Sequence, residues 1–151
     1  MTTETREGTH TIKEAAALTG LPASTLRYYE SVGVIAPVAR GESSRHRVYT
    51  DADMDLLIGV ACLAATGMSV NDMRSYVENG QRGRTAAERQ IALLDERAER
   101  LAEEARLIKV RRKYVDLKIA YWRAVAAGDD AEAGRLAKDA RSLVKRLRLV
   151  K

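Results

Sequence analysis

Residues 11–33, TIKEAAALTGLPASTLRYYESVG, predict two short helices joined by a tight turn. Thr11 and Glu14 have the spacing of a capping box, in which each side chain bonds a backbone N–H at the start of a helix. Gly20 is the residue type that most often follows the last turn of a helix, and a second helix fits residues 23–32. Two short helices separated by TGLP have the spacing of a helix-turn-helix motif.

The second of these helices has two different faces. Leu26 and Tyr29 lie three residues apart on one face, which we expect to pack on the core. Ser24, Arg27 and Tyr28 fall on the other face. A small residue followed by an arginine and a phenol suits the major groove of DNA, where the arginine can bond a phosphate or a guanine edge and the phenol a phosphate. The alternative is that these side chains are ordinary surface groups.

The next segment, VIAPVARGESSRHRVYT at residues 34–50, combines turn-forming residues with a β-prone end. We expect a two-stranded wing in which residues 37–40 pair with residues 46–49. A hairpin tip of this kind can reach the DNA backbone beside the groove. The basic side chains of the segment are Arg40, Arg45, His46 and Arg47, and Glu42 opposes them.

Charge is divided unevenly along the chain. The net charge is +5, but residues 1–80 hold 7 basic and 10 acidic side chains and are therefore net negative by three. DNA binding by the first half must depend on where its cations stand, because its total charge is unfavourable. The excess of cations in the second half is expected on a solvated helix face.

Four further helices are expected, together with the pair described above. Hydroxyl and carboxylate pairs predict three of their starts, at Thr50 with Asp53, Ser69 with Asp72, and Thr85 with Glu88. Gly67 and Gly80 are expected to end two of them. The first helix of the chain is expected at residues 12–18, and the later ones at about 51–65, 70–79, 86–126 and 130–148.

The longest of these helices carries a heptad repeat of apolar residues, which predicts a coiled coil between two copies of the chain. The alternative is an amphipathic helix packed on its own chain, but the first 80 residues are too few to cover so long a stripe. Arg112 and Trp122 occupy two further positions of the repeat. The apolar seam consists of Ile91, Leu94, Ala98, Leu101, Ala105, Ile108, Val115 and Ile119.

The segments TIKEAAALTGLPASTLRYYESVGVI and RVYTDADMDLLIGVACLAATGMSVNDM together resemble the MerR family of bacterial transcription regulators. The most specific pieces are Thr-Leu-Arg-Tyr-Tyr-Glu and the later Arg-x-Tyr. The resemblance implies a mainly α fold. It comprises a winged helix-turn-helix DNA-binding domain at 8–80, a dimerisation helix in an antiparallel coiled coil at 81–127, and a short C-terminal helix at 128–151.

The resemblance also implies a function and its partners. A homodimer would bind a pseudo-palindromic site in double-stranded promoter DNA and distort the spacer, so that RNA polymerase responds indirectly, on the nucleoid in the cytoplasm. DNA contacts carry over to Ser24, Arg27 and Tyr28 and, in the wing, to Arg47 and its neighbours. The family usually has Gly-Tyr where this chain has Arg45-His46, which puts the geometry of the wing turn in question.

The single cysteine, Cys62, is the candidate sensor residue. It matches the position of a cysteine in a subgroup that responds to aldehydes, other electrophiles or nitrosative stress. The alternative is an inert core thiol, because its neighbours in sequence are apolar. One cysteine and two histidines cannot build a soft-metal site or an iron–sulfur cluster, so no metal and no cofactor are expected.

Two other kinds of regulator stay open, and two classes of protein are excluded. The chain could act without an effector as an architectural DNA-binding protein or repressor, or sense a small ligand in an apolar pocket near the C-terminal helix, lined by Tyr114, Tyr121 and Trp122. No nucleophile–base pair or phosphate loop indicates an enzyme, so no catalytic residue is proposed. The longest apolar run, residues 56–65, is too short to span a membrane. The polar start of the chain is not expected to be a signal peptide.

Overall fold

The computed structural model describes residues 8–148, so the polar start at 1–7 and the final residues 149–151 of the C-terminal segment lie outside the description. The fold is mainly α-helical, as predicted. The chain divides into two compact units, one ending at Arg97 and the other beginning at Ala98. No helix in the described part is both long enough and apolar enough to cross a membrane.

The first unit contains the predicted helix-turn-helix and wing. The helix-turn-helix starts at the predicted Thr11–Glu14 capping box and turns at Gly20, whose φ is +72°. The strands and helices, in chain order, are β1 (Thr9–His10), α1 (Ile12–Thr19), α2 (Ala23–Ser31), β2 (Ala39–Arg40), β3 (Arg47–Thr50), α3 (Asp51–Ala65), α4 (Val70–Arg82), the 3₁₀ turn η1 (Gly83–Ala86) and the start of α5 (Ala87–Ala126), which continues into the second unit.

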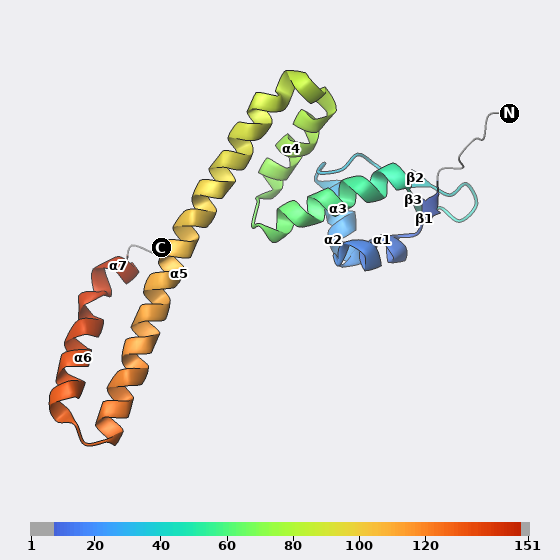
Figure 1. The fold of residues 1–151 in the computed structure, drawn as a ribbon. Helices are drawn as coiled ribbons and strands as arrows, with labels where there is room; N and C mark the ends of the chain where they lie inside the picture. The colour runs from blue at the N-terminus through green and yellow to red at the C-terminus, as the bar shows by residue number, and fades with distance from the viewer. Residues whose placement is uncertain (1–7, 149–151) are drawn as a thin grey trace. The chain divides into compact units, whose positions relative to one another are not determined.

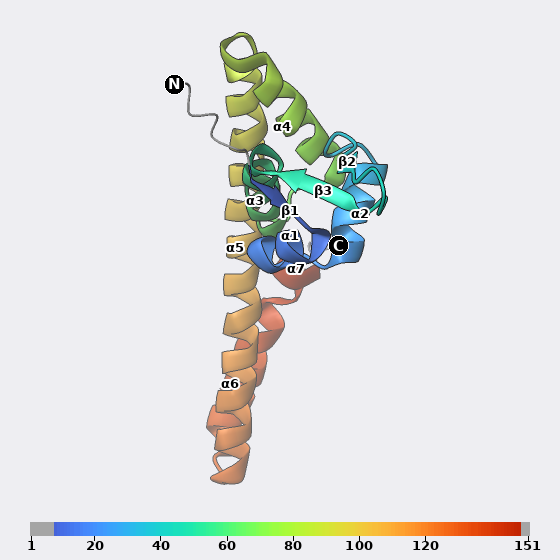
Figure 2. The same ribbon diagram turned by 90° about the vertical axis from the view of Figure 1, so that its right-hand side faces the viewer.

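The wing is part of a three-stranded antiparallel sheet with β3 at its centre (Figure 2). Ala39 pairs with Val48 and Arg40 with Arg47, which confirms the predicted hairpin to within one or two residues at each end. The third strand, β1, was not predicted, because two residues are too few to show a periodicity. Thr50 ends β3 and caps α3 through the predicted pair with Asp53, so the wing leads directly into α3.

One core holds these elements together. Leu26 and Tyr29 of α2 are buried in it, as their spacing predicts, and Tyr49 of β3 is fully buried among residues of α1, α3 and α4. The other main members of this core are Ala15, Val34, Ile35, Val38, Met54, Leu57, Val60, Met68 and Met73. Because α2 and β3 share this core, the exposed face of α2 and the wing are held in one position relative to each other.

Two predicted boundaries in the first unit are wrong. Helix α4 continues past Gly80 to Arg82, whose guanidinium lies 3.2 Å from the Glu78 carboxylate one turn earlier and supports the extra residues. Gly83, with a φ of +57°, ends the helix in place of Gly80. Thr85 does not cap α5, because it lies inside η1 and its hydroxyl donates to the carbonyl of Arg82.

The second unit is a helical hairpin. The C-terminal part of α5 turns at Gly128, and α6 (Asp130–Ser142) returns antiparallel beside it (Figure 1). The predicted single helix 130–148 is broken at Leu143, and α7 (Val144–Arg148) follows. The buried residues of the hairpin are Val110, Ala124, Ala133, Ala140 and Leu143.

Candidate nucleic-acid interface

Helix α2 presents the three predicted contact residues to solvent. Ser24, Arg27 and Tyr28 are exposed, with Tyr28 at 50%, while Leu26 and Tyr29 are buried. The rings of Tyr28 and Tyr29 are 6.2 Å apart between centroids and tilted by 43°. The adjacent tyrosines therefore have different roles. Tyr29 anchors α2 to the core, and Tyr28 is exposed to solvent one residue after Arg27.

The wing tip is closed by its own hydrogen bonds. The N–H of Gly41 donates to the carbonyl of His46, and the N–H of Arg45 donates to the carbonyl of Gly41, each at 2.9 Å. The Arg40 guanidinium also donates to the carbonyl of Arg45 at 3.2 Å. The side chains of Arg40, Arg45 and His46 are exposed. The tip is thus a small ordered turn that presents basic groups.

Arg47 differs from its basic neighbours because its side chain is engaged inside the protein. Its Nε donates to the Glu30 carboxylate of α2 at 2.6 Å, and the two side chains are only 19% and 12% exposed. The second oxygen of Glu30 accepts from the N–H of Val38 at 3.3 Å. This ion pair joins the wing to α2, so Arg47 positions the wing, and a phosphate contact by the same guanidinium stays a prediction.

The basic groups of α2 and the wing border one hollow of about 380 Å³. Arg27 reaches it from α2, and Arg40, His46 and Arg47 reach it from the wing. The N-terminus of α1 closes it with Thr11, Ile12 and Lys13. The geometry therefore brings together four of the seven predicted DNA-contact residues, while Ser24, Tyr28 and Arg45 lie outside this hollow.

Lys13 is the member of this hollow that sequence reasoning missed. It stands in the first turn of α1, where the positive end of the helix dipole disfavours a cation. The sequence held no separate signal for it, because a single lysine beside Glu14 in the first turn of a helix forms no pattern. The helix N-terminus and the lysine together suit a DNA phosphate.

The acidic side chains of the first unit are partly neutralised near this surface. His10 of β1 lies 2.6 Å from the Asp51 carboxylate of α3 and 3.3 Å from the Glu14 carboxylate of α1. The hydrogen bond with Asp51, and then that with Glu14, raises the pKa of His10 above its ordinary value. The His10 hydrogen bond correspondingly lowers the pKa of Asp51 and that of Glu14. The cluster ties β1 to both helices.

The His10 cluster predicts a pH dependence of folding stability. A raised His10 pKa contributes stability that is complete below the ordinary value of 6.5 and is lost as the pH rises through the folded value. We expect the free energy of unfolding in urea to be larger at about pH 6 than at about pH 8. A His10→Gln variant, which does not titrate, should lose this difference; an unchanged pH profile in the variant would contradict the assignment.

The wing turn keeps the conformation that a glycine would provide. Arg45 has a φ of +56°, and no other non-glycine residue of the described chain has a positive φ. The left-handed region costs a residue with a Cβ about 1–2 kcal/mol. The wing turn therefore holds an arginine at a φ that only glycine adopts without a steric penalty.

This strain can be tested with two variants that both remove the Arg45 charge. Arg45→Gly should unfold in urea with a free energy about 1 kcal/mol larger than Arg45→Ala, because only glycine adopts this φ without a steric penalty. The two variants are compared at one protein concentration, since self-association would shift the apparent stability. An Arg45→Ala variant as stable as Arg45→Gly would show that the turn relaxes.

Cys62 lies on α3 and is exposed in the single chain. The alternative of a buried core thiol is therefore wrong for the isolated chain. No group of three or more His, Cys, Asp or Glu side chains in residues 8–148 is arranged to hold a metal ion. Tyr114 and Trp122, which were expected to line an aromatic pocket beside the C-terminal helix, line a hollow formed by α5, and a pocket shared with the C-terminal helix stays a prediction.

The known proteins to which this chain is similar are transcription regulators, which is consistent with a nucleic-acid interface at this surface. Residues 10–79 match the model of the MerR HTH family regulatory proteins. An HTH-type transcriptional regulator of Haemophilus influenzae is 30% identical over 131 residues, which are 85% of this chain and 94% of that protein. The regulator YyaN of Bacillus subtilis is 38% identical over 71 residues, so the match spans 47% of this chain and about half, 51%, of YyaN.

A solved structure extends the likeness beyond the first unit. The crystal structure of HiNmlR, described as a MerR family regulator lacking the sensor domain and bound to promoter DNA, superposes with a TM-score of 0.68 at 29% identity. The superposition covers 83% of this chain and 96% of HiNmlR. These matches establish that the chain belongs to the MerR family of DNA-binding transcription regulators, with α2, the wing and the N-terminus of α1 as its candidate DNA-reading surface.

Proposed function

We propose that the protein acts as a homodimer on a pseudo-palindromic promoter site. The observation that carries the DNA part of the proposal is the grouping of Lys13, Arg27, Arg40 and His46 around one hollow in a domain with an unfavourable total charge. Local placement of this kind orients a domain on DNA, because phosphate contacts fix its register. HiNmlR, which is similar over most of its length, is bound to promoter DNA.

The exposed seam of α5 supports the homodimer. Large apolar side chains stand in solvent along the helix, with Ile108 at 51% and Trp122 at 64% exposure, although α6 already covers another face of α5. So long a contiguous apolar stripe is unusual on a monomeric protein and indicates a partner. All of the predicted seam residues are exposed: Ile91, Leu94, Ala98, Leu101, Ala105, Ile108, Val115 and Ile119.

The spacing of the seam favours a second copy as that partner. Successive seam positions, with Arg112 and Trp122 included, alternate between three and four residues apart and read the same in either direction. When two identical helices pair antiparallel, every seam position of one helix therefore faces a seam position of the other. In this register Ala105 faces the partner's Ile108, Leu101 the partner's Arg112, Ala98 the partner's Val115, Leu94 the partner's Ile119, and Ile91 the partner's Trp122.

On this proposal the dimer regulates by deforming DNA. Two reading surfaces related by a two-fold axis suit two half-sites, and bending or untwisting the spacer between them costs several kcal/mol that differs between sequences. RNA polymerase would respond to the altered spacer and not to the protein itself. The chain would work in the cytoplasm on nucleoid DNA and would need no catalytic group.

The exposure of Cys62 favours a thiol-switched regulator over one with an inert cysteine. A thiol in solvent is reachable by an electrophile, and α3, which carries it, begins directly at the end of the wing strand. The alternatives are regulation without an effector and a small ligand on the helical hairpin. Only an effector response distinguishes these three modes.

The test is transcription in vitro from the promoter upstream of its own operon, with and without an aldehyde. We expect the aldehyde to change transcript yield with wild-type protein and to have no effect with Cys62→Ser, which keeps the size of the side chain but not its nucleophilicity. DNA affinity of the variant serves as the folding control. A variant that still responds would end the thiol hypothesis, and a wild-type protein that binds DNA without responding would favour effector-free regulation.

A further inference from the structure

A dense cluster of basic side chains lies on the second unit, far in sequence from the DNA-reading surface. Residues 106–113 of α5 read RLIKVRRK and contain five cations and no carboxylate. Lys109 and Lys113 are one helical turn apart, and like charges at this spacing destabilise a helix. α7 adds Lys145, Arg146 and Arg148. Repulsion within the cluster therefore lowers the folding stability of the unliganded chain. A bound anion would restore that stability.

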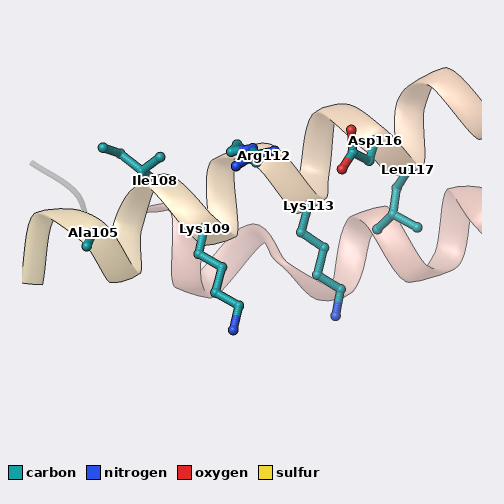
Figure 3. Close-up of a pocket in the computed structure, with 7 residues that line it drawn as sticks. All are labelled: Ala105, Ile108, Lys109, Arg112, Lys113, Asp116 and Leu117. Carbon is teal, nitrogen blue, oxygen red and sulfur yellow. The ribbon is translucent and has the colours of Figure 1, made fainter. Parts of the chain in front are cut away.

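Four of these cations, Arg106, Lys109, Lys113 and Arg146, line one hollow. Lys109 and Lys113 project together from one side of α5, away from Ile108 (Figure 3), and Arg146 approaches from α7. The hollow between them has a volume of about 620 Å³, and Leu107 and Val110 give it an apolar floor.

The carboxylates near this hollow do not neutralise it. Glu103 is the acidic residue in its lining, and it accepts a hydrogen bond from Arg106 at 2.6 Å, so its charge is already matched. Within residues 8–148, no ion pair joins a carboxylate to Lys109, Lys113 or Arg146. Their three positive charges therefore stay available to a ligand.

The chemistry of the hollow selects a class of ligand. Arginine can bind two phosphate oxygens at once and lysine adds a point charge, so two lysines and an arginine suit a group with more than one negative charge. The volume lies in the range of small-molecule sites, and the apolar floor suits an organic body. We propose that the hollow binds a phosphorylated small molecule, with its phosphates between Lys109, Lys113 and Arg146 and its organic part on Leu107 and Val110.

This site does not depend on the proposed dimer, because all of its lining residues belong to one chain. It does adjoin the dimer seam. Lys109 and Lys113 also line a second hollow along α5 that contains the seam residues Ala105 and Ile108 (Figure 3). A bound phosphate group would thus remove repulsion beside the seam.

Isothermal titration of the full chain with two probes tests the proposal. The probes are inorganic pyrophosphate, which supplies the charge alone, and ATP without added magnesium, which adds an organic body. We expect saturable binding of both, with ATP the tighter. Lys109→Ala/Lys113→Ala and Arg146→Ala should each weaken binding at least tenfold. Equal affinities for the two probes would overturn the part of the proposal that concerns the organic body.

Arg111→Ala is the matched control, because Arg111 is two residues from Lys109, on the opposite side of the helix, and does not line the hollow. It should leave both affinities unchanged. An equal loss in this variant, or no saturable binding of either probe at millimolar concentration, would overturn the proposal. So would a loss of promoter DNA affinity in Lys109→Ala/Lys113→Ala that accompanies unaltered pyrophosphate binding, since the cluster would then be a DNA contact.

Discussion

Ile108→Asp should convert the proposed dimer to a folded monomer. Ile108 is 51% exposed in the single chain and stands next to the centre of the seam, where it would face the partner's Ala105. The substitution places two carboxylates near the two-fold axis, where each is desolvated and repelled by the other. We expect the dissociation constant to rise at least about a hundredfold, or roughly 3 kcal/mol, in sedimentation over a concentration series.

Ala92→Asp is the control for this experiment. Ala92 is exposed on the same helix, one residue beyond the seam, so it adds the same charge without entering the interface. Its dissociation constant should stay near that of the wild type. If Ile108→Asp remains as dimeric as Ala92→Asp, with unchanged helicity, α5 is not the dimer interface and the stripe has another partner.

Arg27→Ala should lower affinity for the promoter site by about 1–3 kcal/mol for each half-site if Arg27 reads a base. Arg27 is exposed on α2 and borders the hollow shared by the wing and α1. The loss should be much smaller on a random duplex, because base readout contributes only to specific binding. Fluorescence anisotropy with both duplexes at one salt concentration measures the two affinities.

Arg84→Ala removes one positive charge from the same unit at an exposed position of η1 that does not line the hollow of α2 and the wing. This variant measures how much the loss of any one positive charge weakens DNA binding. It should lower the affinity for both duplexes slightly and by the same factor. An Arg27→Ala variant with wild-type affinity for the promoter would remove Arg27 from the interface. Equal losses on the two duplexes would assign it to a phosphate.

Much of the fold follows from local sequence signals. The capping box at Thr11 and the turn at Gly20 mark where the first helix of the helix-turn-helix begins and ends. Both could be read from the sequence, because each depends only on residues within one helical turn. The spacing of Leu26 and Tyr29 specifies which face of α2 is buried. The heptad repeat specifies which face of α5 stays exposed, and all of its apolar positions do so. The features with a fixed period or a nearest-neighbour partner could thus be predicted.

The features that the sequence did not reveal depend on residues far apart in the chain. The ion pair of Arg47 with Glu30 joins positions 17 residues apart, so the wing arginine looked like a simple DNA contact. The strand β1 exists only because β3 is there to pair with it. Lys13 joins the interface because α1 begins beside the wing hollow. Each needs the folded geometry, which no local pattern contains.

The ion pair between Arg47 and Glu30 has a mechanical consequence. It holds the wing against α2, and Tyr49 anchors the same strand in the core, so the distance between the two candidate DNA-contacting elements is fixed. A rigid pair of contact elements does not adjust its spacing to the duplex that it binds. We therefore expect the duplex to be the compliant member of the complex, and the strain of binding to be stored as curvature and twist in the promoter.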